Sequence, residues 1–288
     1  MNNQLLDGKR AVVSAGAKGM GRAIVLMLAS HGAQVAFCDI DDEAGKITLA
    51  DANALQPGCL YQHCDMGIPD EVDAFSLAAK RRFDHINVLV NVAGINNRGL
   101  LVEQDPAVFE RLLSVNLKGA LRLSRAFMPG MAVAGGGSVI HISSINSTAS
   151  LPGNTAYAAS KGGIEAMSRA FAMDYAPWNV RSNVICPGAV YTSELRPWWE
   201  GCLPDPLDYP LLLAHQPMNG PGLAVNLAST VLFLASDLSS YVTGATLFQD
   251  GGATMQAHRV DAYPQPPDYE DIIEQYRVTL DKSRGGGP

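Results

Sequence analysis

Short apolar runs alternate with longer amphipathic stretches along most of the chain, and this pattern limits the fold more than any other feature. Runs such as Ala11–Ser14 and Val88–Asn91 are hydrophobic continuously rather than at every second residue. Continuous hydrophobicity marks strands that are buried on both faces, so the sheet is expected to be parallel and covered by helices on both sides. The sequence therefore predicts an α/β, doubly wound parallel sheet of seven strands.

The predicted elements follow one another without a linker rich in Gly, Ser or Pro, so residues 1–255 are expected to form a single domain. A Pro-rich loop at 191–222 and a tail at 256–288 do not fit the alternation. Asp268 can cap a short helix in the tail that packs on its own or a neighbouring subunit, and a frayed appendage is the alternative. The predicted strands are 11–14, 34–38, 59–64, 88–91, 138–142, 180–185 and 246–249, and the predicted helices are 21–31, 42–55, 69–83, 105–128, 154–176 and 223–234.

Composition narrows the class of protein. The 288 residues carry a net charge of −7, which argues against a basic surface for nucleic acid. The longest apolar runs are far shorter than the ~20 residues that span a membrane, so no membrane partner is expected. The five cysteines lack paired metal spacing and suit a reducing compartment, so we expect no metal. The polar start Met1–Arg10 is not a signal peptide, and the expected location is the cytoplasm.

Three glycines lie between the first predicted strand and the first predicted helix. Gly16, Gly19 and Gly21 are spaced G-x2-G-x-G. Glycines let the backbone approach a pyrophosphate closely, and a helix N-terminus offers free N–H groups to an anion. The context of strand, turn and helix predicts a dinucleotide site, and the alternative is a merely tight turn.

Two residues near this turn favour different dinucleotides, one NAD and the other NADP. Asp39 ends the second predicted strand, 18 residues after Gly21. A carboxylate there can accept hydrogen bonds from the adenosine ribose and would repel a 2′-phosphate. Lys18, beside the turn, could instead pair with that phosphate. Because carboxylate and phosphate repel at short range, NAD is expected and NADP is the less favoured cofactor.

A tyrosine and a lysine lie one helical turn apart. Tyr157 and Lys161 occupy positions i and i+4 on one face of the predicted helix 154–176. Ser144 ends a predicted strand 13 residues before Tyr157, and Asn116 lies within the predicted helix 105–128. A free tyrosine titrates near ~10, but a neighbouring ammonium favours the phenolate and lowers its pKa. The arrangement therefore predicts general acid–base catalysis.

These motifs, in this order, resemble the classical short-chain dehydrogenase/reductase family. The resemblance runs from about Leu6 to Ala253 and implies a Rossmann fold, NAD(P)-dependent oxidoreductase activity on CH–OH groups and a homotetramer. The further matching pieces are Cys64-Asp65, Asn91-Val-Ala-Gly94, Cys186–Thr192, Tyr241-Val-Thr-Gly244 and Asp250-Gly-Gly252.

The resemblance also implies roles for individual residues. Tyr157 would be the catalytic acid/base, and Ser144 would hold and polarise the substrate oxygen. Lys161 would bond the nicotinamide ribose, and Asn116 would anchor a water that links Lys161 to solvent. The implied cofactor-binding residues are Ser14, Gly16, Lys18, Gly19, Met20, Gly21, Asp39, Ile40, Asp65, Met66, Asn91, Ala93, Gly94, Tyr157, Lys161, Pro187, Gly188, Val190 and Thr192, among which Asp65 would contact adenine, Asn91 the adenosine ribose, and Val190 with Thr192 the carboxamide.

The chain departs from the family pattern at the glycine turn. Ala15 stands where the family has its first glycine. Ala15 fits there if its φ is negative, and Gly16 can then absorb part of the turn.

The expected substrate is a small molecule. Polar side chains recur at positions that face the substrate in this fold, which suggests a sugar, sugar acid or cyclic polyol; a bulkier cyclic alcohol stacked on tryptophan is the rival. Two other functions stay open, namely a 3-oxoacyl-carrier-protein ketoreductase and a non-enzymatic dinucleotide-sensing protein. The candidate substrate residues are Asn97, Arg98, Asn146, Asn154, Arg196 and Trp199.

Overall fold

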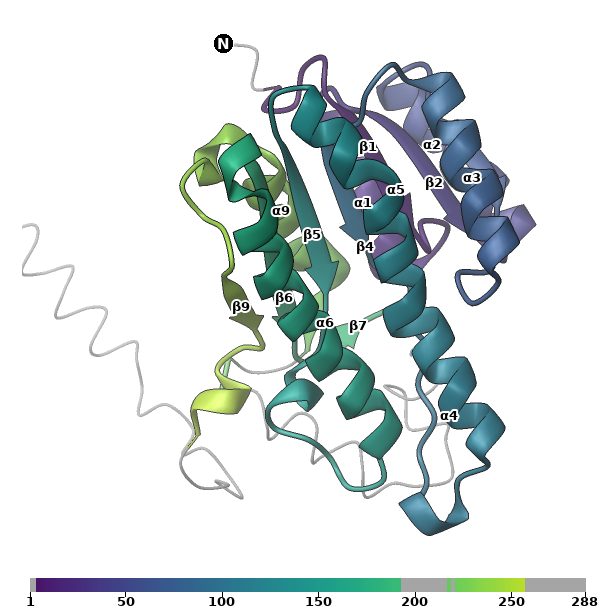
Figure 1. Ribbon diagram of the computed structural model, residues 1–288, viewed down its shortest axis with the longest axis vertical. Coiled ribbons are helices and arrows are strands. Elements are labelled where there is room, and N and C mark those ends of the chain that lie inside the picture. The colour runs from purple at the N-terminus through teal and green to yellow at the C-terminus, as the bar shows by residue number, and fades with distance from the viewer. Residues whose placement is uncertain (1–3, 193–216, 219–220, 257–288) are drawn as a thin grey trace, which may run out of the picture.

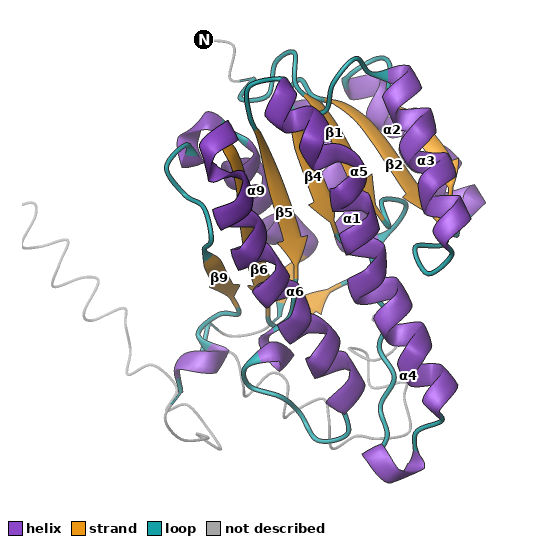
Figure 2. Cartoon of the chain, in the orientation of Figure 1, coloured by secondary structure: helices purple, strands orange, loops and turns teal. Residues whose placement is uncertain are grey.

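The predicted sheet is present in the computed structural model, which describes residues 4–192, 217–218 and 221–256. Seven parallel strands lie in the order β3-β2-β1-β4-β5-β6-β9, with helices on both faces (Figure 1, Figure 2). The strands are β1 (Arg10–Ser14), β2 (Gln34–Asp39), β3 (Leu60–His63), β4 (Val88–Asn91), β5 (Gly137–Ile142), β6 (Val180–Pro187) and β9 (Thr246–Gln249).

Hydrophobic cores lie on both faces of the sheet because successive strand residues point to opposite sides. Val13 of β1 belongs to the core beneath α1 (Gly19–Ser30), α2 (Asp42–Leu55) and α9 (Ala224–Ala235). Val12 belongs to the other core, beneath α3 (Pro69–Arg82) and α5 (Gly119–Val133), with α6 (Thr155–Tyr175) packed beside them. Within the described residues, no helix has the length and hydrophobicity needed to cross a membrane.

The predicted helix over 105–128 is wrong in one respect, because the helix is interrupted. α4 (Pro106–Leu113) leads into a π-helical turn at Ser114–Lys118, and α5 follows. The side chain of Asn116 turns inward there and bonds the backbone of Ile95. α4 packs against α6 whereas α5 packs against α3. The wider turn lets one helical path serve both contacts.

The expectation for the glycine turn is also wrong. Ala15 adopts a left-handed backbone with φ of 52°, whereas Gly16 does not. A left-handed alanine costs roughly 1–2 kcal/mol. This conformation carries the Ala15 carbonyl so close to Gly21 that an added Cβ would lie 1.8 Å from it. Glycine is therefore required at position 21 for steric reasons.

A small second sheet was missed by the sequence reading. β7 (Val190–Tyr191) pairs in parallel with β8 (Gly222–Leu223), and this pairing joins the two ends of the loop predicted at 191–222. Strands of two residues carry no hydrophobic period, so no pattern could have shown them. The predicted tail helix at 268–282 lies outside the described residues.

Candidate active site

The candidate site lies along the carboxyl edge of the sheet. The strand order reverses between β1 and β4, and the connections from these strands diverge to opposite faces of the sheet. Open α/β sheets bind ligands outside the carboxyl ends of their strands at such a reversal. The glycine turn after β1, Gly94 after β4 and Ser144 after β5 all follow strands that end at this edge.

The structure brings Ser144, Tyr157 and Lys161 together. They line one cavity of about 360 Å³. Lys161 is 3% exposed, lies with its Nζ 5.6 Å from the Tyr157 ring centre, and donates to the Ile142 carbonyl at 2.9 Å. Ser144 accompanies them because β5 ends just before it, beside the N-terminal half of α6.

The Ser144 hydroxyl is oriented by Asn146. The backbone N–H and the side-chain Nδ2 of Asn146 lie 3.2 and 3.3 Å from Ser144 Oγ and donate to it. The amide cannot be turned over without loss, because its Oδ1 accepts the Leu151 N–H at 3.0 Å. Since both lone pairs of Ser144 Oγ receive donors, its own proton is left to be donated. Tyr157 lines the same cavity, and its interaction with Ser144 acts to lower the tyrosine pKa.

Burial dominates the protonation of Tyr157 and Lys161. Desolvation raises the pKa of Tyr157, and its hydrogen bond with Ser144 opposes that rise. Desolvation also lowers the pKa of Lys161 to about 8. The sequence predicts a lowered pKa for Tyr157, but in the protein without cofactor this pKa is raised. A lowered pKa requires a further positive charge, which an oxidised nicotinamide would supply.

Asn116 holds the loop after β4. Its side chain is fully buried, with Oδ1 accepting the Ile95 N–H at 2.8 Å and Nδ2 donating to the Ile95 carbonyl at 3.0 Å. Nδ2 also donates to Ser160 Oγ at 3.0 Å, next to Lys161. All the polar atoms of this side chain have protein partners, so any water that it anchors would have to bind its backbone.

Three buried polar groups behind Lys161 were not identified from the sequence. The Ser143 hydroxyl lies 3.1 Å from both the Lys161 carbonyl and Glu165 Oε1. The Cys186 thiol donates to Glu165 at 3.3 Å, and burial raises its pKa to about 12. The signal was weak because serine, glutamate and cysteine at scattered positions form no motif. Glu165 and Cys186 do not line the cavity and instead support the helix that carries Lys161. Ser143 supports this helix and also lines the cavity.

The residues at the glycine turn suit a dinucleotide. α1 begins at Gly19 with no side-chain cap, so its first N–H groups are available to an anion. Gly94 also leaves room, since a Cβ there would lie 3.1 Å from Lys161 Nζ. Besides Tyr157 and Lys161, the predicted cofactor residues that line the cavity are Met20, Gly94, Pro187, Gly188, Val190 and Thr192.

Two predicted cofactor residues have structural partners instead. Ser14 is 1% exposed, and its hydroxyl accepts the N–H groups of Val92 and Ala93, which joins the end of β1 to the end of β4. Asn91 is 5% exposed, and its Nδ2 lies 3.2 Å from the ring of His141. Both side chains therefore support the crevice from within rather than project into it.

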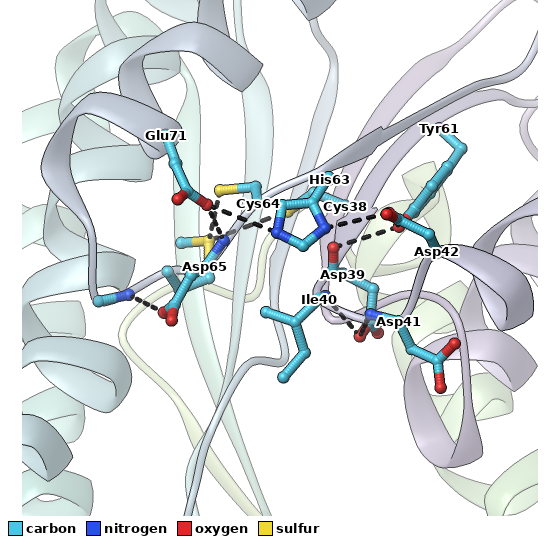
Figure 3. Close-up of polar contacts among 12 residues, drawn as sticks. Cys38, Asp39, Ile40, Asp41, Asp42, Tyr61, His63, Cys64, Asp65 and Glu71 are labelled. Atoms are coloured by element: carbon cyan, nitrogen blue, oxygen red, sulfur yellow. Dashed lines mark hydrogen bonds and ion pairs between the residues drawn. The ribbon is translucent and has the colours of Figure 1, made fainter.

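Acidic residues crowd the ends of β2 and β3 (Figure 3). Asp39 accepts the Ala17 N–H at 3.0 Å and the Ile40 N–H at 2.8 Å, so its carboxylate is fixed beside the glycine turn. Asp41 pairs with Lys18. The Asp39 carboxylate is thus held next to the turn, and its contact with the ribose stays a prediction.

A histidine lies between two further acids at the same edge (Figure 3). His63 Nδ1 is 3.0 Å from Asp42 and His63 Nε2 is 3.9 Å from Glu71. Asp65, expected against adenine, pairs with Arg111 at 2.5 Å and accepts the Gly67 N–H at 2.8 Å. Arg111 was missed because it is on α4, 46 residues from its partner, with no local pattern linking the two.

Four of the six predicted substrate residues can be located. Arg98, Asn146 and Asn154 line the cavity, together with Asn96 in place of the expected Asn97. Asn154 is 1% exposed and donates to Asn146 Oδ1 at 3.2 Å. The remaining two, Arg196 and Trp199, lie outside the described residues.

Several known proteins match most of the chain. A family model described as enoyl-(acyl carrier protein) reductase matches residues 14–254. A trans-4-hydroxycyclohexanecarboxylate dehydrogenase of Sinomonas cyclohexanicum is 34% identical over 252 residues, which is 85% of this chain and 93% of the relative. A D-xylose 1-dehydrogenase of Caulobacter vibrioides is 33% identical over 247 residues, 86% of this chain and 96% of the relative.

Solved structures also match most of the chain. A structure described as a short chain dehydrogenase/reductase family protein superposes with a TM-score of 0.77 at 31% sequence identity. The match covers 87% of this chain and 99% of that chain.

Proposed function

Because the chain belongs to the short-chain dehydrogenase/reductase family, we propose that it is an NAD-dependent oxidoreductase that interconverts a secondary alcohol and a ketone. The observation that carries this proposal is the meeting of Ser144, Tyr157 and Lys161 in one cavity beside a glycine turn. Polar residues lie among the apolar ones that line the same cavity. We therefore infer a cyclic, hydroxylated or acidic substrate, such as a sugar, sugar acid or cyclic polyol.

In this proposal each catalytic side chain has one task. A nicotinamide cofactor, when bound, would supply the acceptor for the hydride of the alcohol carbon. Tyr157, as phenolate, accepts the hydroxyl proton, and its burial makes the exchange sensitive to nearby charge. Lys161 supplies a positive charge beside that phenolate, and Ser144 donates to the substrate oxygen because Asn146 occupies its lone pairs.

The substrate class is supported by the cavity wall and by the relatives. The polar residues that line the cavity lie among apolar ones such as Ile145, Leu151 and Val190; they include Asn96, Arg98, Asn146 and Asn154. A guanidinium can pair with a carboxylate, and the amide of Asn96 can bond a hydroxyl group. The amide of Asn146 already bonds Ser144 and Leu151, so it acts on the substrate through Ser144. The named relatives act on a hydroxylated ring acid and on a sugar, which both fit such a wall.

An acyl-carrier-protein ketoreductase is the second candidate. The description of the matching family model, enoyl-(acyl carrier protein) reductase, favours it. The net charge of −7 counts against docking of a carrier that is itself acidic. Activity on free sugars or ring alcohols without a carrier would separate the two candidates.

Substrate class is tested with the full-length chain and NAD. Initial rates of NADH formation are measured on sugar acids, polyols, sugars and alicyclic alcohols. We expect turnover on at least one hydroxylated acid, sugar or polyol. If only unfunctionalised alicyclic alcohols or carrier-bound acyl groups react, the proposed substrate class is wrong.

The catalytic assignment is tested by Tyr157→Phe. This change removes only the phenolic oxygen, so we expect kcat to fall about 10³-fold, in the range of general acid–base catalysis, while NADH still binds. Tyr175→Phe is the matched control on the same helix, since Tyr175 packs against Trp178 away from the cavity. A Tyr157→Phe protein that retains a tenth of the activity would exclude Tyr157 as the acid/base.

A further inference from the structure

Lys18 is the residue whose role the sequence left open, and the structure shows how it is held. It is the last residue before α1, and it follows Ala17, whose N–H binds Asp39. A cation here lies close to where the adenosine ribose would meet the Asp39 carboxylate. In this chain, however, the Lys18 ammonium forms an ion pair with Asp41.

We propose that Asp41 is a specificity-determining residue that withholds Lys18 from the 2′-phosphate of NADP. The inference rests on the cofactor site of the proposed function. Asp39 repels the phosphate directly, and Asp41 removes the nearest cation that could compensate. The cofactor preference thus depends on two acids that act in different ways.

The Asp41 carboxylate is fixed, so the pair is built into the loop. Asp41 is the N-cap of α2, and its Oδ1 accepts the Ala44 N–H at 3.0 Å while Oδ2 faces Lys18. The hydrogen bond with Lys18, followed by that from Ala44, lowers the pKa of Asp41, so the acid stays charged at neutral pH. Lys18 and Asp41 are both partly exposed, so an added phosphate would compete for the ammonium directly.

The neighbouring cations also form ion pairs with acidic residues. Arg22 on α1 pairs with Asp51 on α2 at 2.7 Å, and Lys46 pairs with Glu43 at 2.7 Å. A phosphate at the ribose would therefore meet the carboxylates of this edge and cations that already have acidic partners. Release of Lys18 from Asp41 is the smallest change that would let an ammonium turn toward that phosphate.

The test is binding of NADPH and NADH, followed by their fluorescence, to full-length protein. Asp41→Asn keeps an oxygen that can cap α2 and removes the charge that holds Lys18. We expect the Kd for NADPH to fall about tenfold, as for one added charge-assisted hydrogen bond, and the Kd for NADH to stay within threefold. Asp39 is unchanged in every variant, so its repulsion cancels from the comparison.

Two further variants separate Lys18 from general charge. Asp42→Asn removes one negative charge from the same loop but leaves the pair of Lys18 with Asp41 intact, so it should change NADPH binding less than threefold. Adding Lys18→Met to Asp41→Asn should abolish the gain. An equal gain in Asp42→Asn, or a gain that survives Lys18→Met, would overturn the inference.

The outcomes also distinguish this inference from the proposed function. If wild-type protein binds NADH and Asp41→Asn gains no affinity for NADPH, only the role of Asp41 is refuted. If wild-type protein binds neither dinucleotide, or prefers NADPH, the proposed NAD dependence and the role of Asp41 are refuted together.

Discussion

A buried ammonium at position 161 works against the stability of the chain. Lys161 is 3% exposed, and its pKa is lowered by burial from 10.5 to about 8. The unfolded chain therefore holds this proton more tightly than the folded chain. Each pKa unit corresponds to about 1.4 kcal/mol, so the buried charge lowers the free energy of unfolding by roughly 3 kcal/mol at pH 7.

Replacing this lysine should stabilise the protein while abolishing turnover. Lys161→Met removes the charge but also the donor to the Ile142 carbonyl, so we expect a net gain of about 2 kcal/mol in the free energy of unfolding at pH 7. The gain should shrink as the pH rises from about 8 to 10.5, because the folded wild type loses its proton over that range. Urea unfolding at several pH values measures it.

Lys118→Met is the control for this effect. Lys118 is half exposed and pairs with Glu110 at the surface, so its replacement should change stability by less than about 0.5 kcal/mol. Equal stabilities of wild type and Lys161→Met at pH 7 would contradict the idea that the buried charge is costly.

At the scale of elements, local signals decided what the sequence could predict. α2 and β4 have the predicted bounds because Asp41 caps one and a continuous apolar run forms the other. The π-turn at Ser114–Lys118 was not predictable, because it depends on Ile95, which is distant in sequence. The left-handed Ala15 was not predictable either, since a propensity argument places alanine at negative φ.

The residues of the candidate site also differ in whether the sequence could predict them. Tyr157 and Lys161 could be predicted to lie together from their helical spacing. Asp39 could be predicted as a cofactor residue because it ends a strand. Asp41 with Lys18 could not be paired, because the two residues belong to different loops that only the fold brings together. Sequence patterns record spacing within an element, whereas contacts between loops depend on the packing of the whole sheet.

The turn between β1 and α1 gives a prediction at this scale. Gly21→Ala would place a Cβ 1.8 Å from the Ala15 carbonyl, so the turn must shift. We expect a loss of about 3 kcal/mol or more in the free energy of unfolding, as for overpacking against backbone. Denaturant unfolding and soluble yield measure this loss.

Gly130→Ala is the matched control on α5. A Cβ at Gly130 meets nothing within 4 Å, and the residue is exposed in a helix. Stability should therefore rise by about 0.5–1 kcal/mol, since alanine favours helices over glycine. If both alanine variants behaved alike, close backbone contact at Gly21 would not be the explanation.

At the scale of the whole molecule, a buried histidine links stability to acidity. His141 of β5 is fully buried, and desolvation, aided by the Lys161 charge, lowers its pKa from 6.5 to about 3. Between these values the unfolded chain binds the proton and the folded chain does not. The free energy of unfolding therefore falls as the pH drops from about 6.5 towards 3.

His141→Gln should make the molecule less sensitive to acid. The variant lacks the titrating ring, so its loss of unfolding free energy between pH 7 and pH 4 should be about 3 kcal/mol smaller than in wild type. Its absolute stability at pH 7 can fall through imperfect packing, which does not affect this difference. Identical pH profiles for the two proteins would show that His141 does not govern acid unfolding.

Two expectations about the whole molecule stay predictions. The homotetramer is implied by family resemblance, and the tail helix at 268–282 falls outside the described residues. Sedimentation of the full-length chain, and of a chain that ends before residue 262, would test both together.

The π-turn at Ser114–Lys118 sets the rotational phase of two helices independently. One extra residue in a turn rotates everything beyond it by about 100° about the helix axis. The apolar stripe of α4 can therefore face α6 while that of α5 faces α3, although the path is continuous. A single-residue deletion in this turn would rotate α5 about its axis relative to α4. The α5 side chains would then no longer face the residues of α3 that they contact now.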